Sequence, residues 1–322
     1  MIIDLALHSF SLWHHFRNVP GFGPIRYIDA CEELGFTGIN LSLNDPNFRH
    51  LGGRETWRMD EVRKRLERSG LSLEIDTSDT NPPHMLHMID VAHRMGAKSM
   101  RFYTRHHGEP QEMVRKTLAD LYQIVDHAQH QDVVLVLENH EDFTGPELAA
   151  MVRTVDHPNL RILYDYGNSQ MVLEDPDAAL DATLPFVRSV HAKDHVMVRA
   201  EDSPHNKLTV AGVPMGEGFL PLRRLTKRLL DNGLRRVCFE NVWAYSAFIR
   251  PHRSPLPGVV LGEGSFRYAQ PPFDPQYLIL DQSKFSGDDL VRMEKIALDR
   301  GTAWFRNLLV ELGCSFRRAV PA

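Results

Sequence analysis

Four residues with metal-binding side chains each lie at or near the end of a short apolar run. Glu138 ends VVLVLE, Asp165 ends NLRILYD, His191 lies within VRSVHAK, and Glu240 ends RRVCFE. Taken singly, each could belong to a salt bridge. Three carboxylates brought together without a cation would repel one another, and their pKa values would rise. A divalent ion removes this repulsion, and three oxygens with one imidazole favour Mn²⁺, with Mg²⁺, Co²⁺ and Zn²⁺ as alternatives.

These runs belong to a regular alternation of strand-like and helical segments. The strand-like runs cover residues 2–7, 36–43, 71–76, 98–104, 133–138, 159–165, 187–193 and 235–240. Alternation implies parallel strands with crossover helices, and eight units over about 240 residues predict an α/β fold, a closed (β/α)8 TIM barrel. An open doubly wound sheet would need a Gly-rich phosphate loop after an early strand, and none is present. Because the strand ends of a barrel share one rim, the four side chains should meet there.

The alternation stops after the eighth strand. Residues 246–285 are rich in Pro, Gly and aromatic residues and predict an extended loop, a length typical of functional or interaction segments. Residues 286–313 predict a closing helix that begins after Ser286 and ends at Gly313. We expect residues 1–322 to form a single TIM-barrel domain with its core at about 1–245. The long loop also suggests a homo-oligomer.

Composition and charge argue against several classes of protein. The chain has 322 residues, of which 43% are hydrophobic and 25% charged, and its net charge of −5 favours neither nucleic acid nor an anionic membrane as partner. No apolar run reaches the roughly 18 residues of a membrane span, and the N-terminus lacks the basic region of a signal peptide. Three scattered cysteines fit reduced thiols, so we expect a cytoplasmic protein.

Short motifs around the four residues carry a resemblance to a known family. The chain resembles the xylose-isomerase-like TIM-barrel superfamily of sugar phosphate isomerases and epimerases over about residues 1–245. The matching motifs are VLENH, LYDYGNS, VHAKDH, PMGEGFLPL and CFENVW. The resemblance implies that Glu138, Asp165, His191 and Glu240 bind one divalent metal ion. It also implies, from the ketose 3-epimerase branch, that Glu138 and Glu240 transfer protons as catalytic residues.

One departure from the family separates two of its branches. Many relatives have a histidine three residues after the strand-six aspartate, and this chain has Asn168. The endonuclease branch needs that histidine and others for a three-metal cluster, so the resemblance argues against a nuclease. In the epimerase branch the same change alters the contacts expected with the substrate.

The predicted chemistry is proton removal from the carbon beside a carbonyl. We predict a metal-dependent isomerase or epimerase that acts on a small carbohydrate, a keto sugar or sugar acid, through a metal-stabilised enediolate. The same enediolate forms when CO₂ leaves a β-keto acid, so a decarboxylase or lyase on an oxidised keto sugar acid is the alternative. A catalytically inactive sugar or metal sensor is a further alternative. The candidate substrate-binding residues are His8, Arg101, Tyr103, His140, Asn168, Lys193, Glu217 and Trp243.

Packing offers an alternative role for several of these candidates. Arg101 and Tyr103 could fill a layer of the barrel, and His8 could be a hydrogen-bonded core histidine. Glu217 could be a solvent-exposed loop charge. Trp243 could serve only as part of the apolar core.

Overall fold

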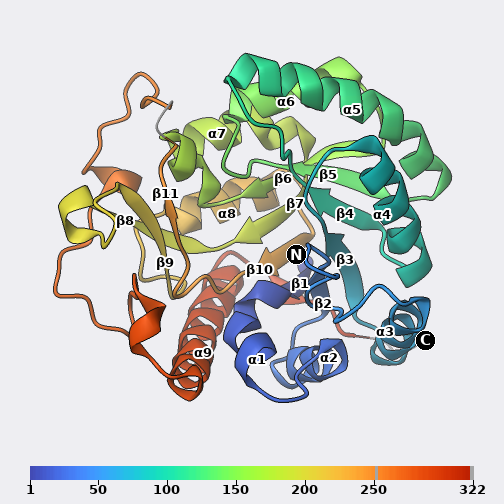
Figure 1. Ribbon diagram of the computed structural model, residues 1–322, viewed down its shortest axis with the longest axis horizontal. Helices are drawn as coiled ribbons and strands as arrows, with labels where there is room; N and C mark the ends of the chain where they lie inside the picture. The colour runs from blue at the N-terminus through green and yellow to red at the C-terminus, as the bar shows by residue number, and fades with distance from the viewer. Residues whose placement is uncertain (251–252, 320–322) are drawn as a thin grey trace.

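Eight parallel strands form a closed barrel in a computed structural model that describes residues 1–250 and 253–319 (Figure 1). Each barrel strand pairs with its neighbour in chain order, and β10 pairs with β1 to close the barrel. The predicted (β/α)8 TIM barrel is therefore confirmed. The strands are β1 (Ile2–His8), β2 (Gly38–Ser42), β3 (Ser72–Asp76), β4 (Ser99–Phe102), β5 (Val134–Glu138), β6 (Leu160–Asp165), β7 (Val187–Ala192) and β10 (Arg236–Phe239).

Helices surround the barrel, and local signals in the sequence explain their ends. Five of the helices, α2, α4, α5, α6 and α7, have proline in their first turn, where its missing N–H costs no hydrogen bond. Gly70 and Gly96 end α3 and α4 with φ values of 68° and 80°, which glycine adopts without strain. The helices are α1 (Trp13–Asn18), α2 (Pro24–Glu33), α3 (Thr56–Ser69), α4 (Pro82–Met95), α5 (Pro110–His130), α6 (Gly145–Val155), α7 (Pro176–Thr183), α8 (Leu222–Asp231) and α9 (Gly287–Glu311).

A small antiparallel sheet interrupts the pattern between β7 and α8. Strands β8 (Asp194–Val198) and β9 (Thr209–Val213) form a hairpin, and β11 (Ser246–Phe248) adds to it as a third strand. This sheet projects from one side of the barrel (Figure 1). Its apolar side chains pack with residues of the later segment, including Ala269 and Leu278. Within the segment 246–285, predicted as an extended loop, residues 246–248 therefore form a strand, and later residues such as Ala269 and Leu278 pack on this sheet.

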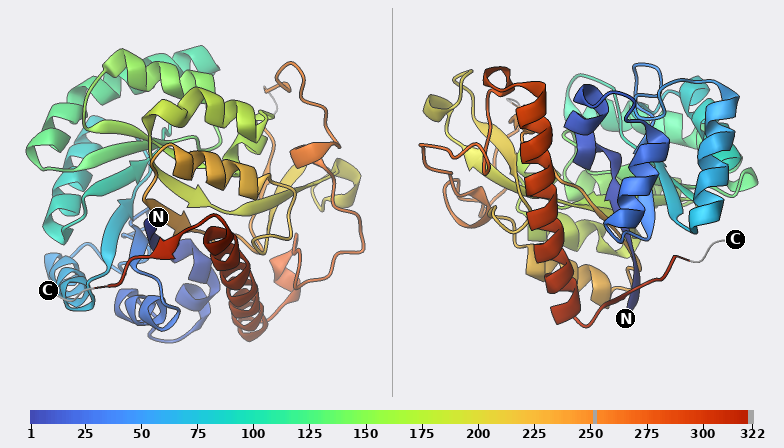
Figure 2. Two further views of the ribbon diagram at one scale, coloured as in Figure 1. Left: turned by 180° about the vertical axis from the view of Figure 1, so that it is seen from behind. Right: turned by 90° about the horizontal axis from the view of Figure 1, so that it is seen from below.

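The C-terminal residues fasten the barrel from outside. Helix α9 packs against α1 and runs beside the barrel (Figure 2). After it, β12 (Ser315–Phe316) pairs with the start of β1. The closing helix predicted at residues 286–313 corresponds to α9. Each helix in the described parts of the chain is too short or too polar to cross a membrane.

Candidate metal and active site

The barrel places the four predicted ligands on neighbouring strands at one rim. Glu138 and Asp165 end β5 and β6, His191 lies one residue before the end of β7, and Glu240 directly follows β10. Asp165 and His191 are register partners across β6 and β7. All four side chains are buried, with Glu240 the most exposed at 8%. Buried charges of this kind need partners, because isolated ions are costly to remove from water.

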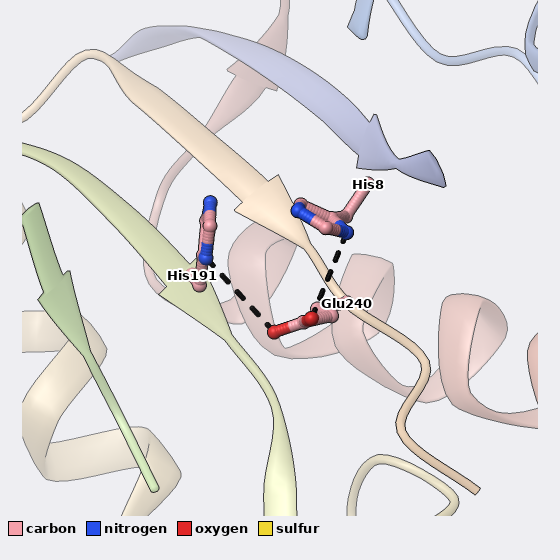
Figure 3. Close-up of side chains that lie close together, drawn as sticks. All are labelled: His8, His191 and Glu240. Carbon is pink, nitrogen blue, oxygen red and sulfur yellow. Dashed lines mark ion pairs between the residues drawn. The ribbon is translucent and has the colours of Figure 1, made fainter. Parts of the chain in front are cut away.

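His191 lies at the centre of the group. Its Nδ1 atom is 3.4 Å from Glu138 Oε1 and 4.0 Å from Asp165 Oδ2. The same nitrogen is 4.0 Å from Glu240 Oε2, and Figure 3 shows Glu240 between the rings of His191 and His8. One atom from each of the other three residues therefore faces the same nitrogen.

Those four facing atoms lack hydrogen bonds. Glu138 Oε1, Asp165 Oδ2, His191 Nδ1 and Glu240 Oε2 are all buried and have no hydrogen-bond partner of ordinary geometry among the described residues. Buried polar atoms are nearly always satisfied, so four such atoms at and around His191 Nδ1 indicate a ligand-binding site. Atoms of Glu138, Asp165 and His191 lie within 4.8 Å of one another, and Glu240 forms a second such group with His191 and His8. Three carboxylate oxygens and one imidazole nitrogen suit Mn²⁺, Mg²⁺, Co²⁺ or Zn²⁺. The residues present therefore fit a divalent metal ion.

The second polar atom of each glutamate faces a cationic or titratable side chain. Glu138 Oε2 lies 2.9 Å from Arg101 and 2.9 Å from His140 Nδ1. Glu240 Oε1 lies 3.6 Å from His8 Nδ1. These contacts orient each glutamate so that its other oxygen faces His191, which is how outer residues hold metal ligands.

Asp165 and His191 are held in a similar way. Asp165 Oδ1 accepts hydrogen bonds from the backbone N–H groups of Gly167 at 2.9 Å and Asn168 at 3.0 Å. His191 Nε2 lies 3.2 Å from Asn40 Nδ2, inside the barrel. In each of the four residues, one polar atom is held by a neighbour and the other faces the remaining members of the group.

The carboxylates differ in the direction in which their pKa values are shifted. Burial would raise the pKa of Glu138, but the Arg101 and His140 charges outweigh it and hold that pKa well below its ordinary value. Burial and the neighbouring glutamates raise the pKa of Asp165, although the Lys193 ammonium opposes them. Burial and repulsion by the two glutamates thus act together on Asp165, and a cation beside it would stabilise its charged form.

Lys193 lies at the edge of the same group. Its Nζ atom is 2.8 Å from Asp165 Oδ2 and 3.3 Å from Glu240 Oε2, and the side chain is buried. Burial would raise the pKa of Glu240, but the charges of Lys193 and His8 lower it to about 2. Lys193 therefore partly neutralises two of the free oxygens.

Most of the predicted substrate contacts surround these carboxylates. His8, Arg101, His140 and Lys193 touch them directly, as the distances above show. Tyr103 stacks on His140 with ring centroids 3.7 Å apart. Asn168 reaches Asp165 through its backbone, and its side-chain Nδ2 has no partner among the described residues.

Glu217 and Trp243 have other partners. Glu217, in the loop between β9 and α8, forms an ion pair with Arg300 on α9. Trp243 is buried in an apolar cluster with Ile279 and residues of α9, and its Nε1 donates to Pro275 O at 3.0 Å. The ion pair accounts for Glu217 and apolar packing accounts for Trp243, so we propose no substrate contact for either residue.

Several buried polar residues on β2, β3 and β8 were not among the residues predicted for the site. Asp76 Oδ2 lies 2.5 Å from His8 Nε2, and Asn40 Nδ2 donates to Glu74 Oε1 at 2.7 Å. Their polar types alternate with apolar residues along β2 and β3, and this period of two could have placed them inside the barrel. His195 on β8 is also buried, and neither ring nitrogen has a partner in the described parts of the chain.

Comparisons with known proteins agree with this architecture. Residues 28–257 match a family described as xylose isomerase-like TIM barrel. The chain is 26% identical over 234 residues to a 3-oxo-isoapionate decarboxylase of Pectobacterium atrosepticum, covering 72% of this chain and 82% of that protein.

Two solved structures share the fold. A D-psicose 3-epimerase crystallised with D-fructose superposes with a TM-score of 0.63 at 15% identity, covering 95% of this chain and 99% of that one. A Mycobacterium smegmatis xylose isomerase-like TIM barrel protein in complex with magnesium gives 0.58 at 16% identity, covering 94% and 97%. Because these identities are low, the superpositions show the fold alone. The family match spans more than half of the sequence, and the chain belongs to the xylose isomerase-like TIM barrel family.

Proposed function

We propose that the protein is a divalent-metal-dependent isomerase or epimerase of a keto sugar or sugar acid. The observation that carries this proposal is the set of four buried atoms from Glu138, Asp165, His191 and Glu240 that lack a hydrogen bond of ordinary geometry among the described residues. Membership of a family that includes sugar epimerases supports it. A bound divalent cation, with Mn²⁺ as the first candidate, would act as a Lewis acid and stabilise negative charge developing on a carbonyl oxygen.

The two glutamates are the proposed proton-transfer residues. They come from β5 and from the end of β10, which are separated by β6 and β7 around the rim. A substrate between them would present opposite faces of its reacting carbon to the two carboxylates. One glutamate accepts the proton and the other returns it. His8 and Lys193 hold Glu240, while Arg101 and His140 hold Glu138.

Deuterium exchange tests this assignment. Full-length protein with Mn²⁺ is incubated in D₂O with a panel of keto sugars and keto sugar acids, and exchange at the carbon beside the carbonyl is followed by NMR. We expect Glu240→Gln to slow exchange by about 10²–10⁴-fold, the usual contribution of a general base. The control is Glu67→Gln, which changes an exposed glutamate on α3. Undiminished exchange in Glu240→Gln would show that this carboxylate is not the base.

A decarboxylase is the second candidate, favoured by two observations. The chain is 26% identical to a 3-oxo-isoapionate decarboxylase over most of both proteins. Lys193 also places a buried ammonium beside Asp165 and Glu240, where it could stabilise charge that develops when CO₂ leaves. The two candidates differ in their products. CO₂ released from keto sugar acids would favour decarboxylation, and its absence across the panel would reject it.

Several properties of the whole protein complete the proposal. We propose that residues 1–322 form one domain, that the protein is a cytoplasmic homo-oligomer, and that it binds a small carbohydrate but no nucleic acid. Light scattering coupled to size exclusion measures the mass in solution, and a monomer mass would reject the oligomer.

A further inference from the structure

Two arginines border the half of the barrel mouth that faces the four carboxylate and histidine side chains. Arg49 lies in the loop after β2, and Arg105 lies in the loop after β4. The candidate metal ligands come from β5, β6, β7 and β10, so β1 to β4 form the other half of the barrel. Loops after the strands of a TIM barrel build the substrate site. Both arginines are thus on loops that can reach a substrate.

Arg105 is linked to Glu138 through two aromatic side chains. Its NH2 group donates to Tyr103 Oη at 2.6 Å, and its Cζ atom lies 4.7 Å from the centre of that ring. Tyr103 stacks on His140 at 3.7 Å, and His140 Nδ1 is 2.9 Å from Glu138 Oε2. The guanidinium is therefore fixed at a defined place relative to the candidate metal ligands.

Arg49 is linked to Glu240 in a parallel way. Its Cζ atom lies 5.1 Å from the ring centre of Trp13 and 5.5 Å from that of Phe10. Phe10 stacks on His8 at 5.5 Å, and His8 Nδ1 is 3.6 Å from Glu240 Oε1. The aromatic faces contact the flat guanidinium and leave N–H groups at its edge for a ligand.

In the part of the chain that the structure describes, neither guanidinium pairs with a carboxylate. No carboxylate among the described residues lies within 4.0 Å of Arg49 or Arg105. The carboxylate of Asp45 is paired with Arg54. Arg49 donates to the backbone carbonyl oxygen of Asp45 at 2.8 Å and not to its carboxylate.

The two arginines lie on loops at the same side of the barrel, after β2 and β4. Burial lowers the pKa of Arg49, and the positive charge of Arg105 acts in the same direction, while Tyr103 opposes them. Burial raises the pKa of Asp142, and the positive charge of Arg105 opposes that rise. The Asp142 carboxylate pairs with Arg250 instead, with its Oδ1 atom 3.7 Å from that guanidinium. Two cations at one side of the barrel, without carboxylate partners among the described residues, attract an anion, and a guanidinium binds carboxylate or phosphate through paired N–H groups.

We propose that Arg49 and Arg105 bind an anionic group of the substrate, a carboxylate or a phosphate, at the side of the barrel mouth formed by the loops after β2 and β4. This inference rests on the proposed function for the position of the reacting carbonyl. It narrows the substrate from a sugar of either kind to one that carries negative charge away from the carbonyl.

Paired ligands that differ only in charge test the proposal. D-Gluconate is compared with D-glucitol, and D-glucose 6-phosphate with D-glucose, by calorimetric titration of the full-length protein loaded with Mn²⁺. We expect at least one anion to bind more tightly than its neutral counterpart. Arg49→Gln and Arg105→Gln should each weaken that binding about tenfold, as expected for loss of one charge-assisted contact. The anion that shows this loss identifies carboxylate or phosphate as the group bound.

Two controls keep the result interpretable. Arg94→Gln removes an exposed arginine that pairs with Asp60 on the outer helices, and it should leave binding unchanged. Arg49→Lys keeps the charge without the paired N–H groups and should lose less affinity than Arg49→Gln. Circular dichroism melting identifies any variant that fails to fold.

Three outcomes would overturn the inference: equal binding of anions and neutral sugars, equal losses in Arg94→Gln, or anion binding that survives both glutamine substitutions. The last would mean that the anion binds the metal ion instead. Deuterium exchange dependent on Glu240 is measured separately, so failure of the anion subsite differs from failure of the proposed function.

Discussion

At the scale of single residues, Lys193 has opposite effects in the metal-free and the metal-bound protein. Its ammonium contacts the free oxygens of Asp165 and Glu240, the atoms that a metal ion would also use. In the metal-free protein this charge offsets repulsion between the carboxylates. When a cation binds, the same charge opposes it, because like charges at short range repel.

We therefore predict that Lys193→Met binds Mn²⁺ more tightly than the unaltered protein. Removal of the ammonium leaves two carboxylates in need of a cation and removes a repelling charge, so the dissociation constant should fall about tenfold, which corresponds to about 1.4 kcal/mol. Calorimetric titration of metal-free protein measures it. Lys227→Met, which alters an exposed lysine on α8, is the control and should have no effect. Unchanged or weaker binding in Lys193→Met would contradict the prediction.

The sequence predicted the four residues at the strand ends and several side chains near them, but not the contacts that these side chains make with one another. Strand-end position follows from periodicity, which is local along the chain. The contact of Asp76 with His8, or of Tyr103 with His140, joins different strands and loops, and their approach is decided only when the barrel closes. The position of a residue along a strand shows which face of the sheet its side chain lies on, but not which other side chain it contacts.

At the scale of elements, Glu174 connects two segments of the barrel wall. It follows the short helical turn after β6, and its Oε2 accepts a hydrogen bond from Gly145 N, the first residue of α6, at 2.8 Å. Burial raises the pKa of Glu174 from its ordinary value of 4.5 to about 7. The other oxygen, Oε1, has no partner among the described residues.

This raised pKa predicts how stability depends on pH. Between about pH 4.5 and 7 the folded protein retains a proton that the unfolded chain releases, so this group lowers the free energy of unfolding as pH rises through that interval. The decrease is at most about 3 kcal/mol. Glu174→Gln keeps an oxygen acceptor without the charge, so its stability should fall less between pH 5 and 8, and it should exceed that of the unaltered protein above pH 7.

Urea unfolding at several pH values measures the difference between the two proteins. Glu67→Gln, at an exposed position on α3, serves as the control and should follow the unaltered protein. Parallel pH profiles for Glu174→Gln and the unaltered protein would refute the assignment.

Most elements of the barrel were predictable, whereas the hairpin was not. Proline at helix starts and glycine at helix ends are local signals in the sequence, and helix α4 begins and ends at such residues. Strand β8 begins two residues after β7 ends, with only Lys193 between them. The sequence predicted one strand-like run at residues 187–193 and no strand directly after it, because β8 is defined by its pairing with β9, and β9 by its pairing with β11, which are not local signals.

At the scale of the whole molecule, the candidate metal site links strands from half of the barrel. Its four side chains come from β5, β6, β7 and the end of β10, which are adjacent around the barrel. The unfolded chain cannot bring these residues together, so an ion that binds them favours the folded state. A pairing between the two ends of the sequence also fastens the other half, where β12 pairs with β1 beside the closing point.

Metal binding should therefore be visible as stability of the entire fold. At 100 times its dissociation constant, Mn²⁺ should raise the free energy of unfolding by about 2.7 kcal/mol, and EDTA should reverse the gain. Asp165→Asn keeps an oxygen that can accept the hydrogen bonds from Gly167 and Asn168 but supplies one charge fewer, so it should lose most of the increment. Asp299→Asn, at an exposed position on α9, should keep it in full. Thermal melting with added Mn²⁺ or EDTA compares the three proteins, and an equal metal-induced shift in Asp165→Asn would place the ion elsewhere.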